Sequence, residues 1–259
     1  PEIRDGKFYA RGADDDKGQS FMHAKAFEYL VKTNALNCNV KFLLEGEEEI
    51  GSPSLEEFCL QNKELLKCDT ILVSDTSMLG SDMPSITTGL RGLAYWQIEV
   101  TAANRDLHSG IFGGAVANPI TELTKLLATL IDAGGRITIP HFYDDVQEVS
   151  ATERELIAQI PFDEEAYKSN LNIKHLRGEK GYSTIERTGI RPAMDICGIW
   201  GGYTKKKKKT VLPSKAFAKL SARLVPNQKY DVIAEVVSEY LKKNAPEYID
   251  IDVIKLHGA

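Results

Sequence analysis

The first third of the chain alternates short apolar runs with segments of helical periodicity. The runs at residues 40–44 and 70–73 have the length and composition of buried strands, and residues 7–10 are a shorter strand candidate. Apolar residues recur at helical spacing over residues 18–33. Ser52 followed by a proline begins a second predicted helix, which ends near residue 62. Strands that alternate with helices predict an α/β fold with parallel crossovers.

Groups of carboxylates follow the predicted strands. Residues 14–16 are three aspartates, residues 45–49 include four glutamates, and Asp75 follows the run at 70–73. Because the carboxyl ends of parallel strands meet at one edge of a sheet, we expect these side chains to lie close together. Solvated acidic loops are the ordinary interpretation of such clusters. Carboxylates that converge repel one another, however, and a divalent cation would offset that repulsion, so the pattern favours a metal site.

The order of predicted elements changes after Gly89. Strand, helix, strand, strand, helix and strand are predicted at residues 93–101, 118–132, 194–200, 216–224, 230–243 and 248–256. This is the order of the split βαβ, or ferredoxin-like, arrangement. We therefore predict two domains: a partial α/β domain over residues 1–87 and a two-layer α/β domain over residues 88–258.

Composition excludes several functional classes. The 32 basic and 37 acidic residues give a net charge of −5, which argues against a dedicated nucleic-acid-binding domain. No apolar run approaches the roughly 18 residues of a membrane span. Four scattered cysteines form no disulfide framework, so reduced thiols and a cytoplasmic location are expected; these cysteines are Cys38, Cys59, Cys68 and Cys197.

Six short motifs occur in a fixed order along the chain. They lie at residues 9–18, 42–52, 73–75, 89–92, 106–110 and 223–227. Together they resemble the family of co-catalytic metallopeptidases that contains cytosolic non-specific dipeptidase, carnosinase, aminoacylase and glutamate carboxypeptidase. The sequence Asp106-Leu-His-Ser-Gly110 with the Leu-Arg-Gly of 90–92 is closer to the dipeptidase branch. The resemblance implies a zinc-peptidase-like α/β catalytic domain, followed by a lid and dimerisation domain.

The resemblance also implies a two-metal hydrolase that uses zinc or, in some members, manganese. In the register of the Asp-x-Lys-Gly motif, Asp15 is the ligand that bridges both ions, although three consecutive aspartates allow a slip of one residue. Glu49 and Asp75 match the terminal ligands, and Glu48 matches the general base. A carboxylate is suited to that role because a water on a metal ion has a lowered pKa.

Three further residues match substrate-binding positions of the family. His108 resembles the histidine that enters the partner subunit's site and stabilises the oxyanion, which implies a homodimer. Arg223 and Thr210 resemble residues that hold the terminal carboxylate of the substrate, and arginine can bind a carboxylate with two parallel hydrogen bonds. On their own, His108 could be an ordinary loop histidine and Arg223 an outward charge on a strand.

Two departures from the family pattern are evident. The family's His-x-Asp element and its late histidine are not in these 259 residues, so we expect the chain to be part of a longer protein. Five lysines at 205–209 stand where relatives carry a glycine-rich stretch, and a solvated loop is the simplest interpretation of them.

The predicted function is hydrolysis of dipeptides or short peptides that have a free carboxyl end. Two alternatives stay open at the level of the sequence. One is an N-acyl-amino-acid amidohydrolase, since the same activated water attacks any amide. The other is an inactive dimerisation or binding fragment, since part of the metal site is missing. No nucleic-acid or membrane partner is expected.

Overall fold

The computed structural model describes residues 1–80 and 82–258. The chain divides into two compact units, Pro1–Thr87 and Thr88–Ala259, and each is described by itself. Among the described residues, no helix combines the length and the apolar character needed to cross a bilayer.

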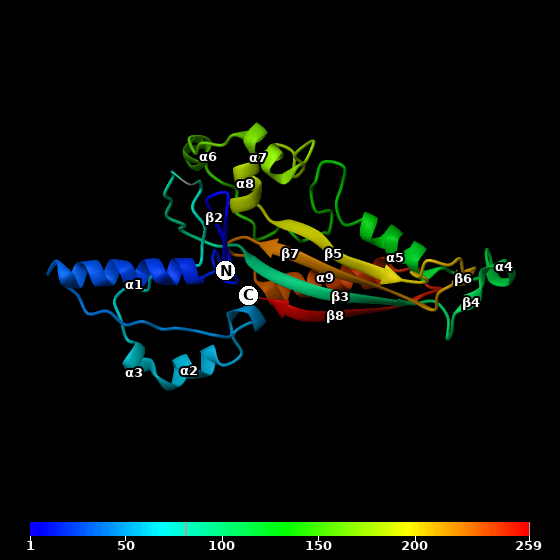
Figure 1. Cartoon of the computed structure of the whole chain (residues 1–259). Helices are drawn as coiled ribbons and strands as arrows, with labels where there is room; N and C mark the ends of the chain where they lie inside the picture. Colours follow the sequence, from blue (N-terminus) through cyan, green and yellow to red (C-terminus); the bar gives the residue numbers. More distant parts are fainter. Residues whose placement is uncertain (81, 259) are drawn as a thin grey trace. The chain divides into compact units, whose positions relative to one another are not determined.

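A four-stranded antiparallel sheet organises the second unit (Figure 1). Its strands are β3 (Gly92–Thr101), β5 (Ala193–Gly201), β7 (Lys215–Leu224) and β8 (Asp250–Gly258). The order across the sheet is β5-β7-β3-β8, and every neighbouring pair is antiparallel. In chain order this is second, third, first and fourth, which confirms the ferredoxin-like topology predicted from the sequence.

Alternating burial explains why β3 and β7 are central. In β3 the side chains of Ala94, Trp96, Ile98 and Val100 are fully buried, while the intervening residues are only partly covered. In β7 the alternate residues from Ala216 to Leu224 are buried in the same way. A strand with one apolar face needs a layer of helices against that face.

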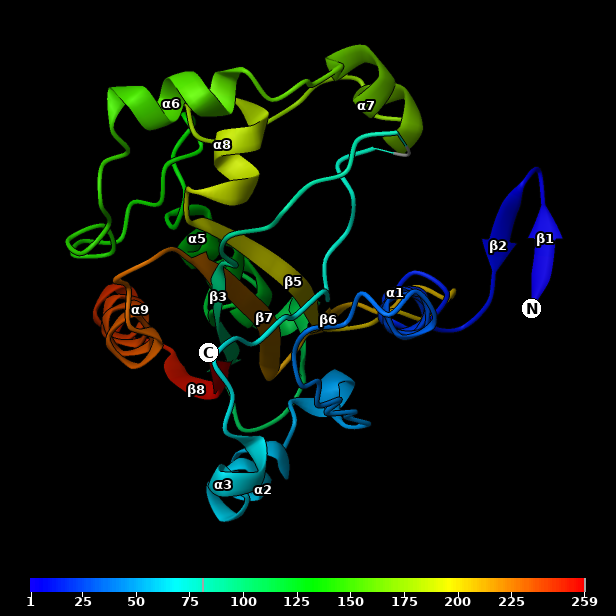
Figure 2. The same ribbon diagram turned by 90° about the vertical axis from the view of Figure 1, so that its left-hand side faces the viewer.

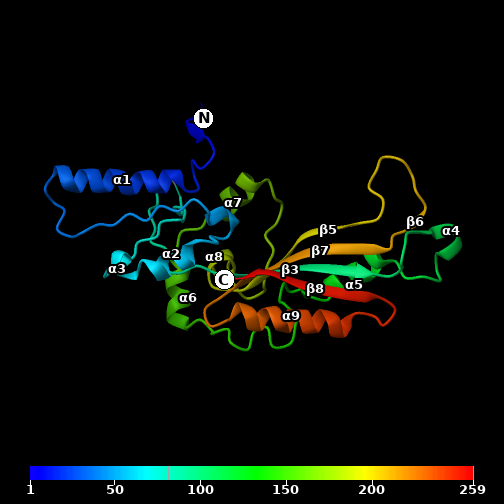
Figure 3. The same cartoon turned by 90° about the horizontal axis from the view of Figure 1, so that it is seen from below.

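Two helices provide that layer: α5 (Pro119–Ala128) and α9 (Tyr230–Asn244). Both lie on the same side of the sheet (Figures 1 and 3). The Asn118 side chain caps α5 by accepting a hydrogen bond from the backbone N–H of Ile120. The indole Nε1 of Trp96 donates to the carbonyl oxygen of Ala234 in α9 at 3.2 Å, so the largest buried side chain leaves no polar atom without a partner. Both predicted helices are confirmed, although α5 ends four residues earlier than expected.

The segment between α5 and β5 carries three short helices. They are α6 (Ala151–Ala158), α7 (Glu164–Leu171) and α8 (Thr184–Gly189). Helices α6 and α8 each begin with a capping box and lie side by side (Figure 2), joined by the ion pair of Arg154 and Glu186 at 2.6 Å.

A buried ion pair holds this segment together. Arg191 is 1% exposed and Glu179 is 7% exposed, and the two form two hydrogen bonds of 2.8 Å each. Arg136 adds a third contact to Glu179 at 3.0 Å, and the Tyr182 ring lies 4.2 Å from the Arg191 guanidinium. Because the two charges are withdrawn from water together, removing either leaves the other uncompensated.

The first unit has far less regular structure. It contains a hairpin of β1 (Glu2–Arg4) and β2 (Lys7–Tyr9), the helix α1 (Lys17–Lys32) and a single 3-10 turn, η1 (Glu48–Ile50). Two short helices follow, α2 (Leu55–Gln61) and α3 (Lys63–Leu66). The predicted strand at 7–10 and both predicted helices are confirmed in position.

The strands predicted at residues 40–44 and 70–73 are wrong for this structure, because both segments are irregular. Their apolar side chains are exposed, with Leu44 at 81% and Ile71 at 79%. A parallel strand is stabilised by hydrogen-bonded neighbours and by helices on both faces. The described residues of this unit do not supply those neighbours, so the apolar runs do not pair.

We expect Arg191→Met to lower the free energy of unfolding of the second unit by about 3–5 kcal/mol, since Glu179 would be left buried without its partner. Both tryptophans, Trp96 and Trp200, lie in this unit, so tryptophan fluorescence during urea unfolding measures the effect. The control is Lys255→Met, which removes an exposed partner of Glu235 and should cost less than about 1 kcal/mol. Equal losses in the two variants would contradict the role assigned to the buried pair.

Candidate functional site

The glutamine at the start of α1 joins two of the predicted acidic segments. Gln19 is the one buried residue of α1, and its Nε2 donates to the carbonyl oxygens of Asp14 and Thr76. The Asp15–Asp16 peptide bond beside it is cis. Gln19 thus fixes the backbone next to Asp15 and next to Asp75, although these two residues are 60 positions apart in the sequence.

An ion pair brings the glutamate segment to the same loop. Nη2 of Arg11 lies 3.1 Å from Oε1 of Glu49. The turn η1 that carries Glu48 and Glu49 ends at Gly51, whose φ of 86° is in the left-handed region that glycine adopts without strain. Glu47 has a local role, because its Oε2 accepts the backbone N–H of Ser54 ahead of α2.

The predicted site carboxylates act on one another electrostatically. Partial desolvation raises the pKa of Glu48, and the negative charges of Asp75, Glu49 and Asp15 raise it further. Partial desolvation likewise raises the pKa of Asp75, with added repulsion from Asp15, Asp16 and Glu49. Glu48 and Asp75 therefore lie within range of the charges of Asp15 and Glu49. The shared sheet edge that was expected to gather these residues is absent, because residues 40–44 and 70–73 form no strands.

This cluster has the donor chemistry of a divalent-cation site without its closed geometry. Carboxylate oxygens suit hard and borderline divalent cations. Within the described residues, no three histidine, cysteine or acidic side chains stand close enough together to hold a metal ion. Glu49 is also engaged by Arg11, so ligation by Glu49 would require that ion pair to open.

His108 and Thr210 meet in the second unit, 102 residues apart in the sequence. Strand β4 (Leu107–His108) pairs with β6 (Val211–Leu212), which places His108 opposite Val211. Nδ1 of His108 accepts the backbone N–H of Gly110 at 3.0 Å, and Nε2 lies 3.1 Å from the Thr210 hydroxyl oxygen. Because Nδ1 accepts, the neutral ring carries its proton on Nε2, which donates to Thr210. His108 thus has one ring N–H donor, which is directed at Thr210 in this structure.

A second contact holds β4 and β6 together, and the sequence did not predict it. Oδ1 of Asp106 accepts both the backbone N–H of Ser214 at 2.9 Å and its hydroxyl at 3.2 Å. These two hydrogen bonds, helped by the nearby charge of Lys209, hold the pKa of Asp106 below its usual range. Asp106 lies in a motif that we had singled out, but nothing in the sequence identified Ser214 as its partner.

Arg223 lies at the other end of the same sheet. Arg223 is exposed near the end of β7 and pairs with Leu93. Lys215 begins β7, is the β7 residue nearest to Thr210 in the sequence, and pairs with Thr101. At about 3.4 Å per residue the eight steps along β7 separate the two ends by roughly 27 Å. Burial is the main cause that lowers the pKa of Arg91, and the positive charge of Arg223 lowers it further. One chain therefore brings His108 to Thr210 but not to Arg223.

Comparisons with known proteins agree with this architecture. Residues 88–249 match the M20 peptidase dimerisation domain. The chain belongs to the M20 peptidase family. It is 34% identical over 241 residues to the beta-Ala-His dipeptidase of Rattus norvegicus, a match covering 92% of this chain and 49% of that protein. It is 34% identical over 242 residues to Cys-Gly metallodipeptidase dug1 of Schizosaccharomyces pombe, with 92% and 51% covered.

A solved structure of an M20 protein is similar over the whole chain. It is the M20 family metallo-carboxypeptidase Sso-CP2 from Sulfolobus solfataricus, with a TM-score of 0.82 and 37% identity, covering 100% of this chain and 59% of that one. The resemblance inferred from the six motifs is thus confirmed at the level of the M20 family. This M20 chain spans about half the length of the curated relatives it matches.

We expect Asp75→Asn to lower the pKa of Glu48, because it removes one of the charges that repel the Glu48 carboxylate. A carboxyl whose pKa is raised by folding contributes stability while it is protonated, and that contribution is lost as the pH rises through the raised pKa. NMR titration of the glutamate side-chain carboxyl carbons measures the shift directly. Glu64→Gln in α3 is the control and should leave the pKa of Glu48 unchanged; an unchanged pKa in Asp75→Asn would contradict the clustering.

Proposed function

We propose that this M20 chain forms part of a metal-dependent hydrolase that cleaves dipeptides or short peptides with a free carboxyl end. The observation that supports the proposal is that Gln19 and Arg11 join the three segments carrying Asp15, Glu48, Glu49 and Asp75, whose carboxylates repel one another. The similarity to dipeptidases named for beta-Ala-His and Cys-Gly supports the substrate class. In this proposal the first unit is part of the catalytic domain and the second is the lid and dimerisation domain.

Asp15, Glu49 and Asp75 would hold two divalent ions, with Asp15 between them. Zinc is the first choice and manganese the second. The chemistry that the bound ions would supply is Lewis-acid activation of a water and polarisation of the scissile carbonyl. Opposite charge from the ions would also relieve the repulsion that raises the pKa values of Glu48 and Asp75.

Glu48 acts as the general base in this proposal. Its carboxylate takes a proton from the attacking water and returns it to the nitrogen of the leaving amine. Glu47 is a poor candidate for the same role, since its carboxylate is hydrogen bonded to Ser54.

The second unit would supply the groups that bind the substrate. Arg223 grips the terminal carboxylate through two parallel hydrogen bonds. The Nε2–H of His108 stabilises the developing oxyanion, with Thr210 beside it. Because Arg223 lies at the opposite end of β7 from His108 and Thr210, all three reach one substrate only if two subunits contribute. We therefore propose a homodimer in which the His108–Thr210 pair enters the partner subunit's site.

A cytoplasmic location is part of the proposal. All four cysteines are free, and three of them are exposed. Unpaired, exposed thiols are characteristic of proteins kept in a reducing compartment.

One alternative is supported by a specific observation. The absence of a closed set of ligands in the described residues, together with the Arg11–Glu49 ion pair, fits an inactive dimerisation or binding module. Calorimetric titration of the chain with zinc or manganese separates the two proposals. Tight binding of two ions per chain supports the enzyme, and weak or undetectable binding supports the module.

We expect Glu48→Gln to lower kcat about 10²- to 10⁴-fold toward a dipeptide, because the general base is lost while the proposed metal ligands remain. The assay uses the intact protein with zinc or manganese and a panel of dipeptides beside N-acetyl amino acids. Glu47→Gln is the matched control and should retain activity. Turnover of the acylated substrates alone would assign an N-acyl-amino-acid amidohydrolase instead.

Mixed dimers test the contribution of His108 to the partner subunit's site. Glu48→Gln and His108→Ala should each be inactive as homodimers, yet an equal mixture after subunit exchange should recover about one quarter of the wild-type activity. Half of the randomly mixed dimers are heterodimers, and each heterodimer contains one site with both an intact Glu48 and an intact His108. If the mixture stays inactive while gel filtration shows exchanged dimers, His108 acts within its own subunit.

A further inference from the structure

The lysine run is an exposed loop, as predicted, and four of its lysines also line a pocket. The segment between β5 and β6 and the start of α5 line an open pocket of about 410 Å³. Lys205, Lys207, Lys208 and Lys209 line this space, whereas Lys206 does not. A cavity of this volume has the size of a small-molecule site rather than of an extended surface.

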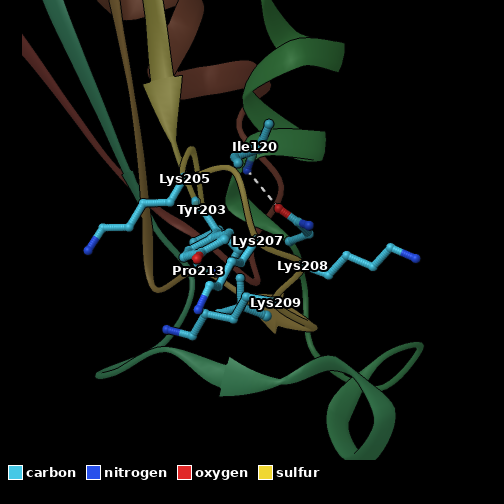
Figure 4. Close-up of a pocket in the computed structure, with 10 residues that line it drawn as sticks. Ile120, Tyr203, Lys205, Lys207, Lys208, Lys209 and Pro213 are labelled. Atoms are coloured by element: carbon cyan, nitrogen blue, oxygen red, sulfur yellow. Dashed lines mark hydrogen bonds between the residues drawn. The ribbon is translucent and has the colours of Figure 1, made fainter.

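The cavity has an apolar wall as well as its charges. Tyr203, Ile120 and Pro213 line it together with the lysines (Figure 4). Gly202, which begins the turn, has a φ of 65°, and a side chain there would lie 3.0 Å from Ile120. Both the positive φ and the close approach to Ile120 favour glycine at position 202, between the apolar wall and the lysine run.

These lysines have no carboxylate partners. None of the five forms an ion pair within the part of the chain that the structure describes, although the protein has a net negative charge. In Figure 4, Lys207 and Lys209 lie close to the Tyr203 ring, while Lys205 and Lys208 extend outward to either side. The Lys209 ammonium is 5.9 Å from the ring centre. The Asp106 carboxylate is near enough to Lys209 to feel its charge, but no carboxylate forms an ion pair with the run, and gathered positive charges repel one another and attract anions.

The geometry points to a binding site for a small polyanion: we propose that this cavity binds a di- or triphosphate group. Lysine ammonium groups are compact charges with three donors each, and they can surround several phosphate oxygens at once. A nucleoside polyphosphate and a free oligophosphate share this chemistry. An extended nucleic acid fits less well, because the overall charge of −5 repels a long anion and the positive charge is confined to one cavity.

The cavity lies in the second unit and adjoins the paired strands β4 and β6 that carry His108. Lys209 directly precedes Thr210, whose hydroxyl contacts His108. Val211, the residue paired with His108, also lines the cavity. A ligand here would therefore contact the strand that positions His108.

The test is isothermal titration calorimetry of the whole chain with sodium tripolyphosphate and, separately, with ATP. We expect one site per chain, with affinity that falls as salt is added because the lysines are exposed. Lys207→Gln with Lys208→Gln should weaken binding about tenfold, since each removes a charged hydrogen-bond donor. Circular dichroism should be unchanged, because neither side chain makes an ion pair.

Two matched controls distinguish a specific binding site in the cavity from a general attraction of anions to surface lysines. Lys206→Gln removes one charge from the same run outside the cavity, and Lys242→Gln with Lys243→Gln removes two from the end of α9. Both should change the affinity by about twofold or less, since screened charges contribute little at a distance. Losses as large as that of the Lys207 and Lys208 variant would overturn the proposal.

The remaining outcomes decide the source of the phosphate group. Tighter binding of ATP that is lost in Tyr203→Leu supports a nucleoside polyphosphate, and equal binding of both probes supports a free oligophosphate. Failure of both probes to bind overturns the proposal. Binding of a single-stranded oligonucleotide alone, with affinity that grows with length, would also overturn it and indicate a nucleic-acid interface.

Discussion

The pairing of β3 with β7 is the constraint on which the second unit depends. Ten residue pairs run from Gly92 opposite Leu224 to Thr101 opposite Lys215, and alternate residues of both strands face the helices. A slip of one residue would turn Trp96 and its neighbours toward solvent, so burial fixes the register. Because the register is fixed, so is the distance between the two ends of the sheet. Arg223 lies at one of those ends and the paired strands β4 and β6 with His108 lie at the other, which is why the proposed site needs a second subunit.

In the first unit, apolar packing contributes less and repulsion between charges contributes more than in the second unit. Its apolar segments find no neighbouring strands among the described residues, and its carboxylates repel one another. Only a few polar contacts join the three acidic segments, chiefly those of Gln19 and Arg11. The two units therefore differ in what determines their local geometry: packed side chains in the second unit, and charge in the first.

The sequence predicted those features that depend on local pattern. The two-residue alternation of Ala94, Trp96, Ile98 and Val100 was sufficient to place β3, and the order of elements was sufficient to identify the ferredoxin-like sheet. The acidic segments were expected to converge because parallel strands end at one edge, but that reason fails where the strands do not form. Their strands could not be predicted correctly, since a run such as residues 40–44 becomes a strand only where it has partners.

Contacts between distant side chains could not be predicted in the same way. Thr210 contacts His108 within one chain, and nothing in the sequence identifies this contact between residues 102 positions apart. Nothing local identifies Arg191 as the partner of Glu179, because an arginine after a short helix is ordinarily solvated. The lysine run shows the same limit, since composition reveals its charge but not the cavity it lines.

A cation in the proposed centre would have consequences beyond catalysis. Asp15, Glu49 and Asp75 come from three segments, so an ion held by all three would join them more strongly than the existing polar contacts do. A ligand that binds only the assembled arrangement stabilises it by mass action, and metal binding to a site that is not closed beforehand is coupled to ordering of the chain. Opening of the Arg11–Glu49 ion pair is then part of the same equilibrium as metal binding. The repulsion that raises the pKa of Glu48 in the absence of a cation would, with one bound, become the attraction that assembles the site.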